Sequence, residues 1–298
     1  MSENIQDKYR QVLNESKVSG DDAAVTAAVA DILAKHFDEN NNVDVYKTCF
    51  NAIDLTKLNS TDTVESITKM VERVNAFEEE YPELPNVAAI CTYPNFAVVV
   101  SGALEVSGVD TAVVAGSFPS SQTFVEIKTA ETALAVKDGA NEVDIVFNLG
   151  LYYGGNYEEL ADEISEIKVA CGDARLKVIL ETGALVRAED IRNASILSMY
   201  AGADFIKTST GKVYPGASLE AAYVMCQSIK EYYEKTGRKV GFKVSGGVST
   251  TDDAVKYYTL VKEILGEEWL NNNYFRIGTS RAANLILSSI LGKEVKFF

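Results

Sequence analysis

The sequence is poor in the residues from which most metal and hydrolytic sites are built. It has one histidine, His36, in 298 residues. A zinc site made of several histidines is therefore excluded, and a Ser-His-Asp triad could use His36 alone. The four cysteines are widely spaced, with no CxxC pair, which predicts free thiols. Carboxylate sites for magnesium stay open on these grounds, but we predict neither a metal nor a cofactor.

Positive charge and long apolar runs are also scarce. The chain has 28 basic and 43 acidic residues, a net charge of −15. Such a surface repels phosphate backbones and anionic lipids, so we predict neither nucleic acid nor membrane as a partner. No apolar run approaches the roughly 20 residues of a membrane span, and the polar first residues favour a cytoplasmic protein. A small phosphorylated ligand stays compatible with the charge, because a basic pocket can lie on an acidic protein.

What the sequence does contain is a pattern that occurs eight times. A short apolar segment is followed by a polar or glycine-rich turn and then by a helical stretch. The predicted strands are 47–55, 87–92, 111–116, 142–148, 176–181, 203–208, 240–245 and 274–278. The predicted helices are 62–79, 95–106, 122–138, 157–170, 187–201, 218–235, 251–265 and 280–291.

Eight strand–helix units in this length predict an α/β fold, a (β/α)8 TIM barrel. A doubly wound sheet is the alternative, since alternation alone does not show that the sheet closes. Residues 1–43 precede the repeats and predict two amphipathic helices. We therefore divide the chain into an N-terminal helical extension, 1–43, and a barrel domain, 44–298.

Charged residues fall on the inward face of several predicted strands. In a barrel the outward face is apolar because it meets the helices. Alternation then directs six charged residues inward: Asp54, Asp144, Lys177, Glu181, Lys207 and Lys243. Thr56 and Asn148 share that face. A structural ion-pair network is one explanation, but barrel interiors usually hold valine, isoleucine and leucine, so a chemical role is favoured.

Two lysines on neighbouring strands suggest the chemistry. Lys207 and Lys243 disfavour each other's positive charge, and burial adds to this effect. A neutral amine is a nucleophile towards carbonyl groups and forms a Schiff base. With a carboxylate such as Asp144 to move protons, these are the parts of a metal-free aldolase. Alternation does not say which lysine is the nucleophile.

Three later loops predict a phosphate site. They contain Thr210-Gly211-Lys212, Ser245-Gly246-Gly247 and Gly278-Thr279-Ser280, and they follow the sixth, seventh and eighth strands. Glycines let backbone N–H groups approach an anion, and a helix N-terminus favours negative charge. The loops after strands 7 and 8 are the usual phosphate site of this barrel.

At these residues the sequence resembles the deoxyribose-phosphate aldolase family of class I aldolases, over about residues 46–292. The most specific segment is GADFIKTSTGK, 202–212. Other matching segments are IDLT at 53–56, ICTYP at 90–94, EVDIV at 142–146, KVILETG at 177–183, GFK at 241–243 and RIGTS at 276–280.

The resemblance implies reversible cleavage of 2-deoxy-D-ribose 5-phosphate to acetaldehyde and D-glyceraldehyde 3-phosphate. It implies that Lys207 is the Schiff-base nucleophile, that Lys243 perturbs it, and that Asp144 is the general acid/base, supported by Asp54. Cys91 matches a position near the substrate. A homodimer is a family-level expectation.

Two departures from the family keep alternatives open. Ser249 stands where the family has a basic residue, and Arg281 where a second serine is common. The alternatives are a lysine-dependent barrel aldolase acting on another sugar phosphate and a non-catalytic sugar-phosphate sensor.

Overall fold

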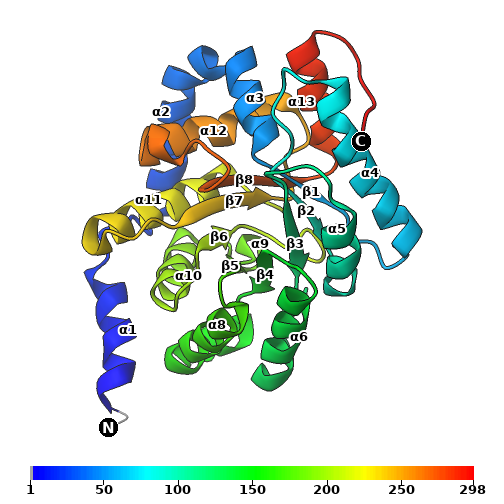
Figure 1. Ribbon diagram of the computed structural model, residues 1–298. Coiled ribbons are helices and arrows are strands. Elements are labelled where there is room, and N and C mark those ends of the chain that lie inside the picture. Colours follow the sequence, from blue (N-terminus) through cyan, green and yellow to red (C-terminus); the bar gives the residue numbers. More distant parts are fainter. Residues whose placement is uncertain (1–2) are drawn as a thin grey trace.

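Eight parallel strands form a closed barrel in the computed structural model, which describes residues 3–298 (Figure 1). The strands are β1 (Ile53–Thr56), β2 (Ala89–Thr92), β3 (Asp110–Val114), β4 (Glu142–Val146), β5 (Arg175–Ile179), β6 (Phe205–Lys207), β7 (Gly241–Ser245) and β8 (Phe275–Thr279). Each strand pairs with the next in sequence, and β8 pairs with β1. This closure confirms the (β/α)8 barrel and excludes the doubly wound sheet.

Helices surround the barrel and cover the outward faces of its strands. Those that follow the strands are α4 (Val64–Glu80), η1 (Pro94–Phe96) with α5 (Ala97–Ala103), α6 (Val125–Lys137), α7 (Leu149–Tyr153) with α8 (Tyr157–Cys171), α9 (Thr182–Leu185) with α10 (Ala188–Tyr200), α11 (Leu219–Thr236), α12 (Thr251–Leu265) and α13 (Arg281–Leu291). A short turn, η2 (Glu267–Trp269), precedes β8. The core between strands and helices contains the residues predicted to face outward, among them Ile145, Ile206 and Phe242.

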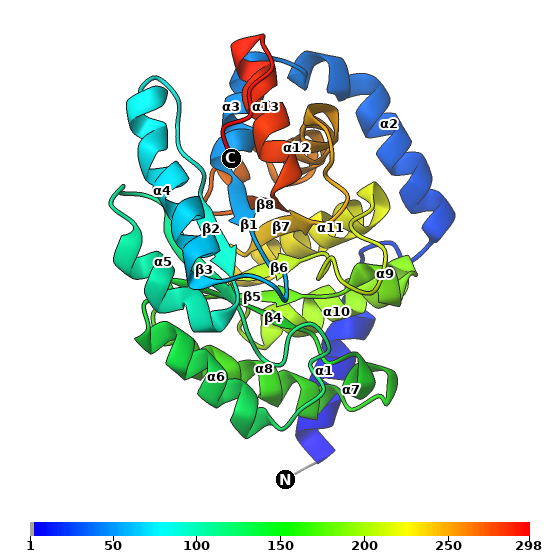
Figure 2. The same ribbon diagram turned by 90° about the vertical axis from the view of Figure 1, so that its right-hand side faces the viewer.

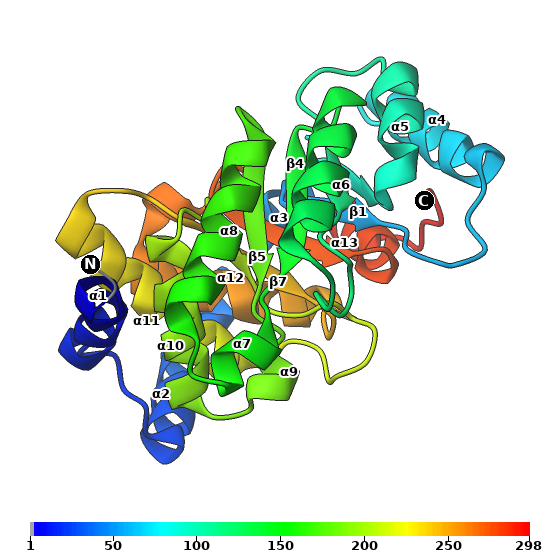
Figure 3. The same ribbon diagram turned by 90° about the horizontal axis from the view of Figure 1, so that it is seen from below.

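Three further helices precede the first strand: α1 (Glu3–Glu15), α2 (Asp22–Asn40) and α3 (Val43–Asn51). Helix α2 packs against α11 and α12 (Figure 2), and α1 lies at the periphery of the molecule (Figure 3), against α8 and α10. The Asp22 carboxylate accepts a hydrogen bond of 2.7 Å from Ala188 N, at the start of α10. The extension is thus joined to the side of the barrel. Residues 1–2 of the predicted extension lie outside the described residues.

The prediction of a strand over 47–55 was wrong for most of its length. Residues 47–51 belong to α3, which Asn42 caps by accepting hydrogen bonds from two backbone N–H groups. Cys49 and Phe50 are buried on one face of this helix. Their apolar character was taken for a strand, although a helix with one buried face produces it equally well. The other seven strands lie within two residues of their predicted bounds.

The local sequence explains where several helices begin. Thr63 and Thr250 each form a capping box, with Ser66 and Asp253 three residues later, so that the first backbone N–H groups are satisfied. Ser218 caps α11 through one hydrogen bond. Among the described residues, no helix is long and apolar enough to cross a membrane.

Candidate active site

The inward side chains fill the barrel in three levels, because alternate strands contribute to alternate levels. The lowest level holds Glu142, Phe205 and Arg276, from β4, β6 and β8. The next level holds Asp54, Lys177 and Lys243, from β1, β5 and β7. The highest, nearest the carboxyl ends of the strands, holds Cys91, Asp144, Lys207 and Gly278. Seven of these side chains are charged groups that water barely reaches.

The two lower levels form a dense ion-pair network. Arg276 contacts Asp54 at 2.6 Å and Glu142 at 2.8 Å. Lys177 pairs with Glu142, with Asp144 at 3.2 Å and with Asp54 at 3.5 Å. Burial alone would lower the pKa of Lys177, but these three carboxylates together raise it. Lys177 therefore stays charged.

The two lysines of the predicted site share one oxygen atom. Lys207 and Lys243 lie opposite each other in the register of β6 and β7. Lys207 Nζ lies 2.9 Å from Asp144 Oδ2, and Lys243 Nζ lies 2.8 Å from the same atom. Lys243 also pairs with Asp54. The structure thus brings together the four residues predicted as catalytic.

The pKa values of the two lysines nevertheless shift in opposite directions. Burial and, secondarily, the charge of Lys243 lower the pKa of Lys207, against the opposing effect of Asp144. Burial would also lower the pKa of Lys243, but Asp144 and Asp54 together raise it. The expectation that each lysine lowers the pKa of the other holds for Lys207 only. The number of carboxylate partners decides the outcome.

A count of charges leads to the same assignment. The barrel interior holds four cationic side chains, Lys177, Lys207, Lys243 and Arg276, and three carboxylates, Asp54, Glu142 and Asp144. An unpaired buried charge is costly, so one cation is in excess. Lys207 has a single carboxylate partner, so its charge is the least compensated of the four. The count therefore favours Lys207 over Lys243 as the candidate nucleophile, a distinction that alternation alone could not make.

Apolar groups close the space beside this amine. Cys91 is fully buried, and burial raises the pKa of its thiol, so the thiol stays protonated. Leu58 packs over it in a small cluster with Ala112 and Val114. The Lys212 ammonium donates a hydrogen bond to the Leu58 carbonyl, which links the β6–α11 loop to the β1–α4 loop. The predicted nucleophile, 2% exposed, thus lies in a buried compartment.

A pocket of about 870 Å³ opens above this compartment. All the residues predicted to hold phosphate line it: Thr210, Gly211, Lys212, Gly246, Gly247, Gly278 and Ser280. Gly246 and Gly247 adopt φ values of +70° and +98°, which favour glycine. A Cβ atom at Gly278 would lie 3.2 Å from Lys243 Cε and 2.8 Å from Ser245 Oγ. The pocket floor at Gly278 therefore lies directly against Lys243, and a side chain there would displace Ser245 or Lys243.

Two charged residues of the site were missed by the sequence reasoning. Glu142 and Arg276 lie at the lowest level, and both could have been found by the alternation used for the other strands. Glu142 is two residues before the inward Asp144, and Arg276 lies between the outward residues Phe275 and Ile277. The available signal was a spacing of two residues from Asp144 for Glu142, and a charged residue between two apolar ones for Arg276.

Two residues beyond strand ends behave differently from each other. Asn148 was expected to point inward, but it lies past the end of β4, accepts a hydrogen bond from Leu151 N and donates one to Glu163. Alternation fails there because α7 begins at the next residue. Glu181 is buried with φ +57° and accepts hydrogen bonds from Thr210 N (3.1 Å) and Thr210 Oγ1 (2.5 Å). It therefore fixes the loop that carries Lys212.

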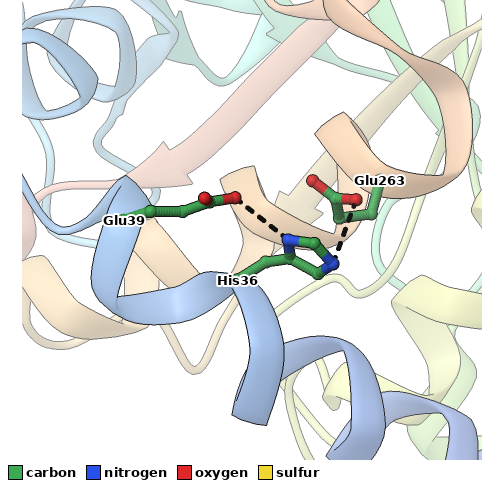
Figure 4. A group of neighbouring side chains, drawn as sticks. All are labelled: His36, Glu39 and Glu263. Atoms are coloured by element: carbon green, nitrogen blue, oxygen red, sulfur yellow. Dashed lines mark hydrogen bonds and ion pairs between the residues drawn. The ribbon is translucent and has the colours of Figure 1, made fainter.

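His36 lies far from this site, between α2 and α12 (Figure 4). Its Nδ1 faces Glu39 at 3.0 Å and its Nε2 faces Glu263 at 3.5 Å. The two carboxylates approach opposite nitrogens of the ring. This arrangement joins the extension to the barrel.

Fold and site together define a class of protein: a (β/α)8 barrel enzyme with a buried lysine of lowered pKa below a pocket lined by glycine loops and cationic side chains. Comparison with known sequences agrees, since the sequence model of the DeoC/LacD family aldolases matches residues 48–262. The chain belongs to this family of aldolases.

Named relatives extend the match over most of the chain. A Caenorhabditis elegans protein, provisionally named deoxyribose-phosphate aldolase, is 41% identical over 259 residues, 85% of this chain and 84% of its own. The human deoxyribose-phosphate aldolase is 41% identical over 238 residues, 76% of this chain and 75% of its own. The solved deoxyribose phosphate aldolase from Aeropyrum pernix, described as a unique tetramer, has a TM-score of 0.66 at 28% identity and covers 87% of this chain and 97% of its own.

Proposed function

We propose that this protein cleaves 2-deoxy-D-ribose 5-phosphate reversibly to acetaldehyde and D-glyceraldehyde 3-phosphate, through a Schiff base on Lys207. The observation that carries the proposal is the shared Asp144 oxygen. It lies within 3 Å of both lysines, yet only Lys207 has a lowered pKa. The relatives named for this activity support the same substrate.

The first half of the reaction uses the neutral amine. Lys207 Nζ attacks the C1 aldehyde carbon of the open-chain sugar, and the resulting carbinolamine loses water to give a protonated Schiff base. Asp144 moves protons between the amine, the carbinolamine oxygen and an ordered water. Lys243, kept charged by Asp54 and Asp144, returns a proton to that relay.

The second half breaks the bond between C2 and C3. A proton leaves the C3 hydroxyl, glyceraldehyde 3-phosphate departs, and the bonding electrons pass to the iminium nitrogen to form an enamine. Protonation of the enamine at C2 and hydrolysis of the Schiff base then release acetaldehyde and regenerate Lys207. The buried compartment around Cys91 and Leu58 limits side reactions with bulk water.

The phosphate group is assigned to the glycine loops. Gly246 and Gly247 orient backbone N–H groups, Lys212 supplies a cation, and Ser280 begins α13, where the helix dipole favours an anion. Ser280 does not use its side chain to cap α13, so its hydroxyl can meet a ligand. Thr210 positions this loop through Glu181.

Trapping the intermediate tests the nucleophile. The protein is incubated with acetaldehyde and borohydride, and the adduct is located by mass spectrometry. We expect modification of Lys207 and retained modification in Lys230→Ala, a control at an exposed lysine on α11. Active protein with an unmodified Lys207 peptide would refute the assignment.

The alternative substrate rests on Ser249 and Arg281, which both line the pocket. Cleavage rates on deoxyribose 5-phosphate, ribose 5-phosphate and a ketose bisphosphate separate the two candidates. We expect the 2-deoxy sugar to be cleaved fastest, whereas preference for a ketose would favour the alternative. Binding without any turnover would favour a sensor.

Two wider expectations belong to the same proposal: a homodimer in solution and a cytoplasmic location. Light scattering coupled to gel filtration measures the first, and cell fractionation measures the second. A monomer, or recovery in a membrane or secreted fraction, would contradict them.

A further inference from the structure

The lining of the pocket above Lys207 contrasts with the rest of the molecule in its charge. It includes five cationic side chains, Lys57, Lys69, Arg73, Lys212 and Arg281, and no acidic one. The chain as a whole has 43 acidic and 28 basic residues. A second hollow of about 680 Å³, between α6 and α8, shows the opposite sign, with six carboxylates in its lining. Cations are therefore concentrated in this one pocket.

The five cations come from two separate walls. Lys212 and Arg281 follow β6 and β8 and flank the glycine loops, where the sugar's phosphate is assigned. Lys57, Lys69 and Arg73 come from the β1–α4 loop and from α4. A single phosphate at the glycine loops accounts for the first wall but gives no role to the second.

Two of the α4-side cations are held in place by backbone carbonyls. Lys57 Nζ donates to Ser66 O at 3.1 Å, which leaves two of its N–H groups free. Arg73 Nε donates to Phe297 O at 2.8 Å, and its guanidinium carbon lies 4.0 Å from the centre of the Phe297 ring. Figure 2 shows the end of the chain beside α4. These contacts position the side chains without neutralising them.

The charges of this wall are also incompletely paired. Among the side chains of residues 9–298, no carboxylate lies within ion-pair distance of Lys57 or Arg73, and the same is true of Lys212 and Arg281. Lys69 pairs with Glu65 at 2.6 Å, and Glu65 does not line the pocket. Four unpaired cations around one hollow attract anions strongly.

We propose that the α4 wall, Lys57, Lys69 and Arg73, is a second anion subsite, and that the pocket binds a ligand carrying two phosphate groups. The first phosphate occupies the glycine loops and the second lies against α4. Such a ligand is a bisphosphorylated sugar or another small diphosphate, which would act as a substrate or a competitor. The inference rests on the proposed function for the position of the first phosphate only.

Simple polyanions test the proposal without depending on turnover. Calorimetry measures the binding of inorganic phosphate, pyrophosphate and tripolyphosphate at constant ionic strength. We expect pyrophosphate or tripolyphosphate to bind at least about tenfold more tightly than phosphate, because a second site is engaged by the same ligand. If neither longer ion binds more tightly than phosphate, the second subsite does not exist.

A double variant shows which residues cause the tighter binding of the longer ions. In Lys69→Gln/Arg73→Gln, the advantage of the longer ions should fall below about threefold while phosphate binding stays within about twofold. The matched control Lys230→Gln, on the exposed face of α11, should keep the full advantage. A parallel loss for phosphate and the longer ions would show a single shared site and would overturn the proposal. The borohydride adduct on Lys207 reports separately on the proposed function.

Discussion

The lower and upper levels of the barrel interior both contain lysines and carboxylates, but the pKa values of their lysines shift in different directions. Lys177, at the middle level, contacts three carboxylates, and its pKa is raised. Lys243, beside it, contacts two carboxylates, and its pKa is also raised. Lys207, at the top, contacts one carboxylate, and its pKa is lowered. All three side chains are buried to about the same extent.

The comparison shows that burial alone does not make a reactive amine. Desolvation acts on all three lysines in the same direction. The number of nearby carboxylates then determines whether the pKa of each lysine is raised or lowered. The charges of the lower levels therefore pair with one another, and Lys207, at the highest level, is the lysine with the fewest carboxylate partners.

The largest expected effect is the loss of turnover when the amine of Lys207 is removed. Lys207→Ala should reduce turnover by at least about 10³-fold, because the covalent route is lost. Its melting temperature should stay near that of the parent, since three cations and three carboxylates remain inside. Steady-state kinetics and calorimetry measure the two quantities. Retained turnover would place the nucleophile elsewhere.

Removing Lys177, a cation of the middle level, should instead reduce the stability of the fold. Lys177→Met leaves three carboxylates with only Lys243 and Arg276 as charged partners, and breaking a buried ion pair typically costs about 3–5 kcal/mol. Urea unfolding should show a loss of this size, even if the catalytic lysine is intact. A stability equal to that of Lys207→Ala would show that the two levels contribute equally to stability.

Changing the neighbour of the nucleophile should move its titration. Lys207 must lose its proton to attack, so kcat/KM rises with pH through its pKa. Lys243→Leu removes a like charge and frees Asp144 to favour the Lys207 ammonium, which raises that pKa. The acid limb of the pH–rate profile should then move to higher pH by about one to three units. An unmoved limb would remove the like-charge argument.

The smallest expected effect is a change in KM when the β6–α11 loop, which carries Thr210 and Lys212, is loosened. Glu181→Gln replaces a carboxylate that accepts two hydrogen bonds from Thr210, and charge-assisted bonds of this kind contribute about 1.5–3 kcal/mol. Since this loop carries Lys212, KM for the sugar phosphate should rise about tenfold, with a smaller change in kcat. A fall in kcat with unchanged KM would assign Glu181 to the chemistry instead of the loop.

The sequence predicted the inner surface of the barrel better than its rim. Strict alternation along a strand fixes which residues point inward, and this placed Asp54, Lys207 and Lys243 in one chamber. Alternation does not extend past the strand ends, so Asn148 was misplaced. The order of the lysine pKa values was also out of reach, because it depends on how many carboxylates from other strands reach each nitrogen.

The α4 wall could not be anticipated for a related reason. Lys69 and Arg73 look like ordinary exposed residues of an amphipathic helix, one turn apart. Only the curvature of the closed barrel brings α4 beside the loops after β7 and β8. Contacts between segments so distant in the chain leave no periodic signal in the sequence.

The odd number of charges inside the barrel has a consequence during the reaction. In the proposed reaction Lys207 is neutral at rest, which leaves three cations and three carboxylates in the chamber. The iminium would then add a fourth cation opposite the same Asp144 oxygen. That carboxylate would stabilise the electron-poor nitrogen while the breaking carbon–carbon bond needs an electron sink, and the charges would balance again once the electron pair has been received.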